Sequence, residues 1–152
     1  MFNIQTATSE QMSKLLPYLK VFSSFNEKVY RLTKGRVLGK LAGYDICLVT
    51  MTGAKSGKKR VLPLMYVPHK EGVIIVASQG GAPRNPAWFN NLVVNPDIEV
   101  QYKAKKMQLR ARRVNAQEKA EVWPTCCKYY PDYDLYQKRT DRDIPVFVCE
   151  PR

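Results

Sequence analysis

The sequence predicts a single α+β domain in which about six mainly antiparallel strands form a sheet and helices pack outside it. Short apolar runs separated by Gly, Pro and Asn clusters recur from residue 44 onward, which is typical of antiparallel strands. The first 34 residues show apolar residues at helical spacing instead. The length of 152 residues and the hydrophobic content of 45% suit one core. We therefore expect one domain over 1–152, with an N-terminal helical segment at 1–34 and the core at 44–151.

The N-terminal segment predicts a helix over residues 11–33 that Pro17 disturbs. Its apolar face is expected to comprise Phe22, Phe25, Val29 and Leu32. Packing of this face on the sheet is the expectation, and a lid or a membrane-touching helix stays open because basic residues accompany the aromatic ones. A basic connector with several glycines follows at 34–43.

Three apolar runs at 47–52, 61–67 and 73–77 predict three strands. The first two flank residues 53–60, here called the basic loop, which contains two glycines and the cations Lys55, Lys58, Lys59 and Arg60. Gly53 and Gly57 are expected to let the backbone turn and present N–H groups, so the loop suits an anion such as phosphate. The spacing is not that of a Walker A loop, because three residues rather than four separate the glycines. A solvated basic turn is the alternative.

A second glycine loop at 78–83 follows the third of these strands. A short helix is expected to begin at Pro86, with Asn85 as its cap and Trp88 in its first turn. Trp88 offers either a flat wall to a ligand or ordinary core packing. The two glycine loops together suit the two ends of one long anionic ligand.

The rest of the chain predicts strands at 98–102 and 107–114 joined by a polar turn, and a closing strand at 144–149. A capping box at 115–118 predicts a helix that Pro124 should bend or restart. Spacing places three tyrosines of this region on one helix face, where they serve packing or bind a ligand: Tyr129, Tyr133 and Tyr136.

The net charge of +12 indicates an anionic partner: nucleic acid, a membrane surface or an acidic cofactor. No zinc-finger or RRM pattern is present, which disfavours nucleic acid. The four cysteines form no C-x-x-C pair and the chain has a single His69, so no metal site is expected. No apolar run is long enough to span a bilayer, and residues 1–14 lack a signal core. These features predict a cytoplasmic protein.

Three blocks of the sequence resemble the deazaflavin (F-420)-dependent nitroreductase and quinone reductase family. The first block reads Thr50-x-Thr52-Gly53-x-Lys55-Ser56-Gly57-x-x-Arg60-x-x-Pro63-Leu64. The second reads Ala77-Ser78-x-Gly80-Gly81-x-x-x-x-Pro86-x-Trp88-x-x-Asn91-Leu92-x-x-Asn95-Pro96. The third comprises Tyr133-x-x-Tyr136 and Ile144-Pro-Val-Phe-Val148. The resemblance covers residues 35–151 with the blocks in order.

This resemblance implies a split β-barrel of the FMN-binding-like kind and an oxidoreductase that passes a hydride from a reduced deazaflavin to a quinone, a nitroaromatic compound or a similar electron-poor acceptor. The cofactor is expected to be coenzyme F-420, an 8-hydroxy-5-deazaflavin. Its phosphate would contact Lys55, Ser56, Lys58 and Arg60. Its ring and groove would be lined by Pro63, Leu64, Met65, Ser78, Gln79, Trp88 and Asn91. The acceptor would face Tyr133 and Tyr136, as catalytic groups.

One departure from the family pattern bears on the cofactor. Relatives often carry a basic residue where this chain has Ala54. FMN therefore stays open as an alternative cofactor on the same fold, and a non-catalytic flavin- or lipid-binding protein is the other alternative. The resemblance predicts a small-molecule acceptor as partner and no nucleic acid, and it leaves open a homodimer and peripheral contact with the inner face of the membrane.

Overall fold

The computed structural model describes residues 27–36, 39–41 and 43–152. Eight strands occur there: β1 (Lys40–Leu41), β2 (Tyr44–Thr52), β3 (Lys59–Met65), β4 (Val67–His69), β5 (Gly72–Val76), β6 (Asp97–Tyr102), β7 (Lys105–Arg113) and β8 (Val146–Pro151). The labelled helices are the short 3-10 helix η1 (Gln79–Gly81), α2 (Phe89–Val94), α3 (Ala116–Tyr129) and α4 (Asp132–Arg139). Residues 27–33 are helical as well.

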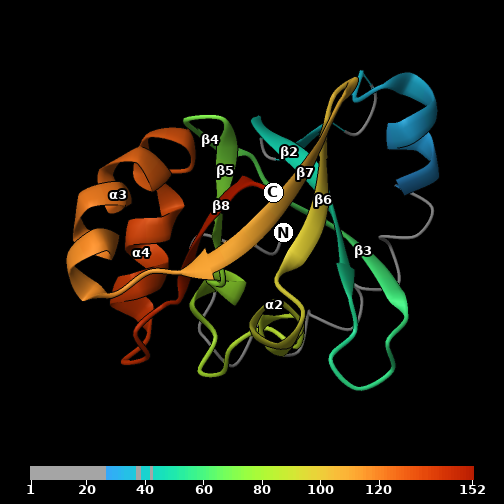
Figure 1. Cartoon of the computed structure of the whole chain (residues 1–152). Coiled ribbons are helices and arrows are strands. Elements are labelled where there is room, and N and C mark those ends of the chain that lie inside the picture. The colour runs from blue at the N-terminus through green and yellow to red at the C-terminus, as the bar shows by residue number, and fades with distance from the viewer. Residues whose placement is uncertain (1–26, 37–38, 42) are drawn as a thin grey trace.

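The strands form one curved antiparallel sheet in the order β1-β2-β6-β7-β8-β5-β4, and β3 pairs with β2 beside this path (Figure 1). This confirms the predicted α+β class with mainly antiparallel strands. The strand count exceeds the expected six, partly because the run predicted at 61–67 divides at Tyr66 into β3 and β4. The chain changes neighbours there, since β3 pairs with β2 and β4 pairs with β5.

Two hydrophobic cores lie on the two faces of this sheet. The inner core fills the barrel with side chains from β2, β5, β6, β7 and β8, among them Val49, Ile75 and Phe147. The outer core lies between the sheet and the helices α3 and α4, which pack side by side over β4, β5 and β8 (Figure 1). Strand β7 shows why one face is buried: Met107, Leu109 and Ala111 point inward while the residues between them are exposed.

The helix after residue 115 begins as predicted and ends differently. The Asn115 side chain accepts the backbone N–H of Glu118 at 2.9 Å, which confirms the cap. The expectation that Pro124 bends or restarts the helix was wrong, because α3 continues through it to Tyr129. Pro124 is exposed, so water can satisfy the carbonyl that its missing N–H leaves unpaired. The helix ends before Pro131 instead, which disfavours helical geometry in the residue preceding it.

The helix predicted to begin at Pro86 also differs. Helix α2 starts at Phe89, and the Asn85 side chain does not cap it. The Asn85 oxygen accepts a hydrogen bond from Arg142 at 2.7 Å instead. Tertiary contact with a cation has therefore replaced the local cap that the sequence favoured.

The predicted N-terminal helix lies largely outside the described residues, including Phe22 and Phe25. The described turns, 27–33, bury Tyr30 and leave Leu32 85% exposed, so the expected apolar face was wrong at Leu32. The Tyr30 hydroxyl accepts the Lys103 backbone N–H at 2.7 Å and lies 3.2 Å from the Ile46 carbonyl oxygen. This polar anchor fixes the helix on the sheet. None of the described helices has the length and apolar character needed to cross a bilayer.

Candidate functional site

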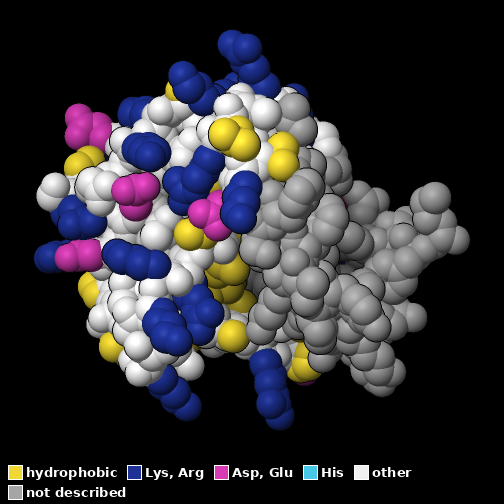
Figure 2. All heavy atoms as spheres, turned by 90° about the vertical axis from the view of Figure 1, so that its right-hand side faces the viewer, with side chains coloured by type: hydrophobic (Ala, Val, Ile, Leu, Met, Phe, Trp, Pro, Cys, Tyr) yellow, Lys and Arg dark blue, Asp and Glu magenta, His cyan; other side chains and the backbone are white. Residues whose placement is uncertain are grey.

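The basic loop connects β2 and β3 and projects from one end of the molecule (Figure 1). The four side chains predicted to hold a phosphate are all exposed there: Lys55, Ser56, Lys58 and Arg60. Figure 2 views the molecule from this side and shows Lys and Arg side chains over the face with few acidic ones between them. Among the described residues none of these three cations forms an ion pair, so their charge is available to an anion.

The backbone N–H groups of the two loop glycines are not presented to a ligand. Gly53 donates to the Lys58 carbonyl at 2.8 Å, and Gly57 donates to the Gly53 carbonyl at 3.0 Å. The expectation that these amides face an anion was therefore wrong, because closing the hairpin uses them. Gly57 has φ +68°, so glycine is needed there for the turn. An anion at this loop is therefore not held by the two glycine amides.

Hydrogen bonds connect helix α2 and its C-cap residue to the start of the basic loop. The Asn91 Oδ1 atom accepts the Ala54 N–H at 2.8 Å, and the Asn95 Nδ2 atom lies 3.3 Å from the Thr52 carbonyl oxygen. Asn91 thus fixes the loop rather than pointing its amide oxygen at a ligand. Trp88 directly precedes this helix and packs, half-buried, against the inner core.

The residues predicted to line a ring lie on β3. Strand β3 pairs with β2 on one edge, and among the described residues its other edge has no strand partner. Backbone N–H and C=O groups along that edge are therefore available to a planar ligand. Leu64 packs against the inner core and Met65 against the outer core, so Pro63, Leu64 and Met65 cross from one core to the other.

The second glycine loop is tightly wound. Gln79, Gly80 and Gly81 have φ of 47°, 63° and 77°, three left-handed residues in a row. Ser78 precedes them, is 8% exposed, and its hydroxyl makes no cap hydrogen bond. No other described residue bonds this hydroxyl.

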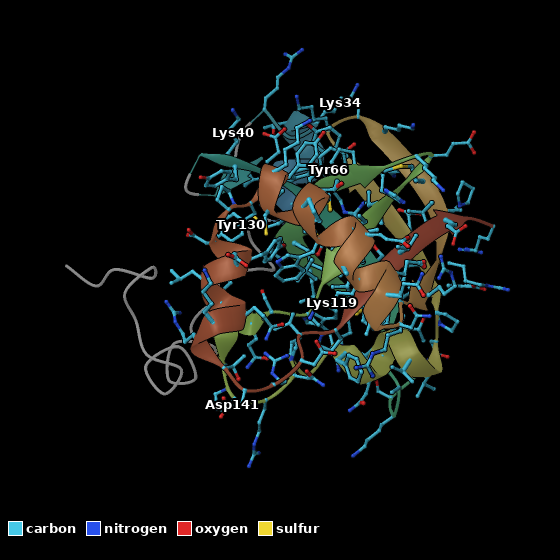
Figure 3. All side chains as sticks on the ribbon, turned by 90° about the vertical axis from the view of Figure 1, so that its left-hand side faces the viewer. Lys34, Lys40, Tyr66, Lys119, Tyr130 and Asp141 are labelled. Atoms are coloured by element: carbon cyan, nitrogen blue, oxygen red, sulfur yellow. The ribbon has the colours of Figure 1, made fainter. Side chains whose placement is uncertain are left out.

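Helix α4 carries the two tyrosines predicted to face an acceptor, and both are buried at 4% exposure. The Tyr136 hydroxyl lies 2.8 Å from that of Tyr130. Figure 3 labels Tyr130, which lies between α3 and α4. The Tyr133 hydroxyl has no hydrogen-bond partner among the described residues. Burial raises the pKa of all three hydroxyls above the ordinary value of 10.0. They are therefore neutral phenols at neutral pH, suited to donating hydrogen bonds.

The tyrosine face differs from the one expected in one member. Tyr129 lies in α3 and is 38% exposed, so it does not share a face with Tyr133 and Tyr136. Tyr130 takes that place, with its ring 5.0 Å from that of Tyr133 and 5.9 Å from that of Tyr136. Pro131 separates α3 from α4, so Tyr129 and Tyr133 do not lie on one continuous helix. This proline was the signal in the sequence that helical spacing does not relate the two residues.

A cleft of about 540 Å³ lies elsewhere on the molecule, beside the β4–β5 turn, α3 and β8. Its lining includes His69, Arg112, Glu118 and Glu150, and none of the predicted site residues. Arg112 is already paired with both carboxylates there. Most of the predicted cofactor-binding residues lie instead at the end of the molecule that carries the basic loop, α2 and the second glycine loop (Figure 1). We take this end as the candidate site.

The geometry agrees with comparisons to known proteins. The sequence profile of the F420H(2)-dependent quinone reductases matches residues 23–151. The chain belongs to this family. A similar protein is the F420H(2)-dependent quinone reductase Rv1261c of Mycobacterium tuberculosis, 35% identical over 131 residues, which cover 84% of this chain and 88% of the relative.

Solved structures of similar proteins share the fold of this chain. The F420-H2 dependent reductase FDR-A is 44% identical, with a TM-score of 0.65 over 69% of this chain and 93% of its own. A second structure, described as a domain-swapped dimer, is 39% identical with a TM-score of 0.67 over 83% and 96%. HutZ of Vibrio cholerae, a heme storage protein, is 14% identical with a TM-score of 0.54 over 85% and 89%, and shows the fold alone.

Family membership confirms several predictions made from the sequence. The chain is an oxidoreductase with the split-barrel fold, and its reductant is F420H2. Its activity is that of an F420H2-dependent quinone reductase.

Proposed function

We propose that F420H2 binds along the end of the molecule that carries the basic loop, with its ring near the unpaired edge of β3, and that a quinone approaches it from the side of α4. The phosphate contacts come from Lys55, Ser56, Lys58 and Arg60. Support for this comes from the charge of the exposed loop, whose cations have no acidic partner among the described residues. The glycine amides are used within the hairpin, and the three cations among these residues are long, exposed side chains that bind anions by charge.

The ring is proposed to lie against Pro63, Leu64 and Met65 on one side and against Ser78 and Gln79 on the other. The unpaired edge of β3 offers backbone hydrogen bonds to the polar atoms of a flat heterocycle. Trp88 closes the groove as an apolar wall, and Asn91 contributes by holding the basic loop through Ala54.

Two buried hydroxyls that bond no described residue carry this proposal. Ser78 is 8% exposed and Tyr133 is 4% exposed, and neither hydroxyl forms a hydrogen bond within the described part of the chain. A buried polar group that lacks a partner costs about 1–3 kcal/mol, so such groups mark places where a ligand completes the pairing. Their presence on the second glycine loop and on α4 fits a polar heterocycle and an acceptor oxygen.

When bound, F420H2 supplies the hydride that reduces the quinone. The chain's part is to bind, orient and exclude water. Tyr133 and Tyr136, whose phenol pKa values are raised further by burial, donate hydrogen bonds toward the acceptor oxygen, where negative charge grows as the hydride arrives. Nitro oxygens accept hydrogen bonds in the same way, so nitroaromatic compounds are proposed as further acceptors.

The first test is a fluorescence titration of the purified protein with F420 and, beside it, with FMN. We expect saturable binding of F420 and much weaker binding of FMN. Oxidation of F420H2 should then depend on added quinone, with a nitroaromatic compound as the second acceptor. Binding of neither flavin would refute the site. Binding without turnover by any acceptor would favour the non-catalytic carrier.

We propose further that the chain forms a single domain over residues 1–152 and pairs as a homodimer in contact with the inner face of the cytoplasmic membrane. A similar structure is a domain-swapped dimer. The basic face in Figure 2 suits an anionic lipid surface. Light scattering after size exclusion tests the dimer, and co-sedimentation with anionic and neutral vesicles tests the contact. A monomer would refute the proposed dimer. Equal binding to anionic and neutral vesicles would refute the proposed contact with an anionic membrane surface.

A further inference from the structure

All N–H donors of the Arg142 guanidinium form hydrogen bonds to one short segment of the chain, residues 77–85. It follows α4, next to Asp141, which Figure 3 labels at the end of the helix far from Tyr130. Nη1 donates to the Ala77 carbonyl at 3.1 Å and to Asn85 Oδ1 at 2.7 Å. Nη2 donates to the carbonyls of Ser78 at 2.8 Å and Ala82 at 3.0 Å, and Nε donates to Ala82 at 3.2 Å. An arginine has five N–H donors, so none is left over.

The backbone of the segment that Arg142 contacts, residues 77–85, is conformationally strained. Gln79 has φ +47° and is not a glycine, so its left-handed conformation is strained. Within the turn, Gly81 donates to the Ser78 carbonyl at 2.9 Å and Ala82 donates to the Gln79 carbonyl at 3.1 Å. Arg142 adds bonds from outside to carbonyls at both ends of this turn. A strained loop persists when its surroundings fix it from several directions.

The charge of Arg142 is met by dipoles alone. Among the described residues no carboxylate forms an ion pair with it, and the side chain is partly buried. Hydrogen bonds from a charged donor are stronger than neutral ones. The planar fork matches acceptors that lie in different directions, whereas a lysine has three donors on a single atom.

The same segment is locked to helix α4. Arg139 Nη1 donates to the Gly80 carbonyl at 2.8 Å, and its guanidinium lies over the Tyr136 ring at 5.3 Å. A Cβ atom at Gly81 would lie 2.6 Å from the Tyr136 carbonyl oxygen, so the two backbones are in direct contact. The loop that carries Ser78 therefore lies in direct contact with the helix that carries the tyrosines.

We propose that Arg142 is the positioning residue of this oxidoreductase: it sets the second glycine loop so that Ser78 and Gln79 meet the cofactor while α4 presents Tyr133 and Tyr136. This inference rests on the proposed placement of F420H2. Nothing in the sequence singled out Arg142. Its effect on catalysis passes through the loop and not through contact with the reacting atoms.

The test compares Arg142→Lys with Arg110→Lys, an exposed arginine that pairs with Asp97. Hydrogen–deuterium exchange of residues 77–85, without cofactor, should rise about tenfold or more in Arg142→Lys and stay unchanged in the control. The Kd for F420 should rise about tenfold, and kcat at saturating F420H2 should fall about tenfold, because misplaced loop groups affect both. Asn85→Ala, which removes one of the acceptors, should show the same pattern at smaller size.

The outcomes separate the two proposals. Wild-type protein that fails to bind F420 refutes the proposed site, and the exchange data still report on the loop. Wild-type exchange and kinetics in Arg142→Lys overturn the positioning role. Faster exchange throughout the chain, or a fall in kcat with the Kd unchanged, indicates loss of folded protein only and overturns it as well. If Arg142→Lys does not fold, Asn85→Ala decides by the same criteria.

Discussion

The two glycine loops of this protein are built in opposite ways. The basic loop is exposed, closes on itself through Gly53 and Gly57, and keeps its cations without acidic partners among the described residues. The second glycine loop is buried, left-handed over three residues, and held by Arg142. The exposed cations of the basic loop are able to attract an anion because no described carboxylate pairs with them. The guanidinium of Arg142 instead uses all its N–H donors to fix the conformation of the second glycine loop. We therefore expect the basic loop to contribute affinity and the second glycine loop to contribute orientation.

The largest difference is expected when a methyl group is added to each loop at a glycine of positive φ. Gly81→Ala should cost about 3 kcal/mol of unfolding free energy, because left-handed strain adds to overlap with the Tyr136 carbonyl. Gly57→Ala should cost about 1 kcal/mol, since no atom lies near its Cβ position and only the strain remains. Urea unfolding of both variants measures this. Equal losses would contradict the distinction between the loops.

Removing the Tyr133 hydroxyl should separate stability from activity. Tyr133→Phe should leave the free energy of unfolding within about 0.5 kcal/mol of wild type or raise it, because that hydroxyl bonds no described residue. Turnover should fall about 100-fold as a hydrogen bond to the developing charge is lost. Chemical denaturation and steady-state assays with a quinone check the two parts.

Tyr136→Phe is the matched variant on the same helix. It should cost about 1 kcal/mol, since it also breaks the hydrogen bond to Tyr130. Turnover should fall while the Kd for F420 stays the same. Unchanged turnover in both variants would remove the tyrosines from the mechanism.

The basic loop should govern affinity and not turnover. Lys55→Ala and Arg60→Ala should each raise the Kd for F420 about tenfold, which corresponds to about 1.4 kcal/mol. The effect should shrink at high salt, because these side chains are exposed. Turnover at saturating F420H2 should stay near wild type, and Lys106→Ala, an exposed lysine on β7, serves as the control. A loss of saturated turnover equal to the loss of affinity would place this loop in the chemistry.

The smallest effect is expected from pH. Burial raises the pKa of the Tyr130, Tyr133 and Tyr136 hydroxyls above 10.0, so each stays a neutral donor through pH 10. The stability that these buried neutral phenols contribute is fully present below pH 10 and is lost as the pH rises through their folded pKa values. Turnover at saturating substrates should therefore show no tyrosine ionisation between pH 6 and about 9. A fall centred below pH 9 that disappears in the Phe variants would contradict this.

Much of the fold could be predicted because its signals are local. Alternation in β7 and the cap at Asn115 each depend on neighbours in the sequence, and both are confirmed. Asn85 was misread because a strong local signal, a capping residue before Pro86, lost to a distant one, the guanidinium of Arg142. The amides of Gly53 and Gly57 were misread because a hairpin consumes its own N–H groups when it closes tightly.

The sequence by itself determined the α+β class, the order of the strands along the chain, the basic loop and the resemblance of its three blocks to a reductase family. These follow from periodicity, turn residues and charge, which depend on chemistry within short stretches. Only the tertiary structure decided that Tyr130 replaces Tyr129, that the buried hydroxyls of Ser78 and Tyr133 bond no described residue, and that Arg142 holds the second glycine loop. The reason is physical: burial depends on how the elements pack, and the partners of Arg142 lie some 60 positions away in the sequence, which no local pattern records.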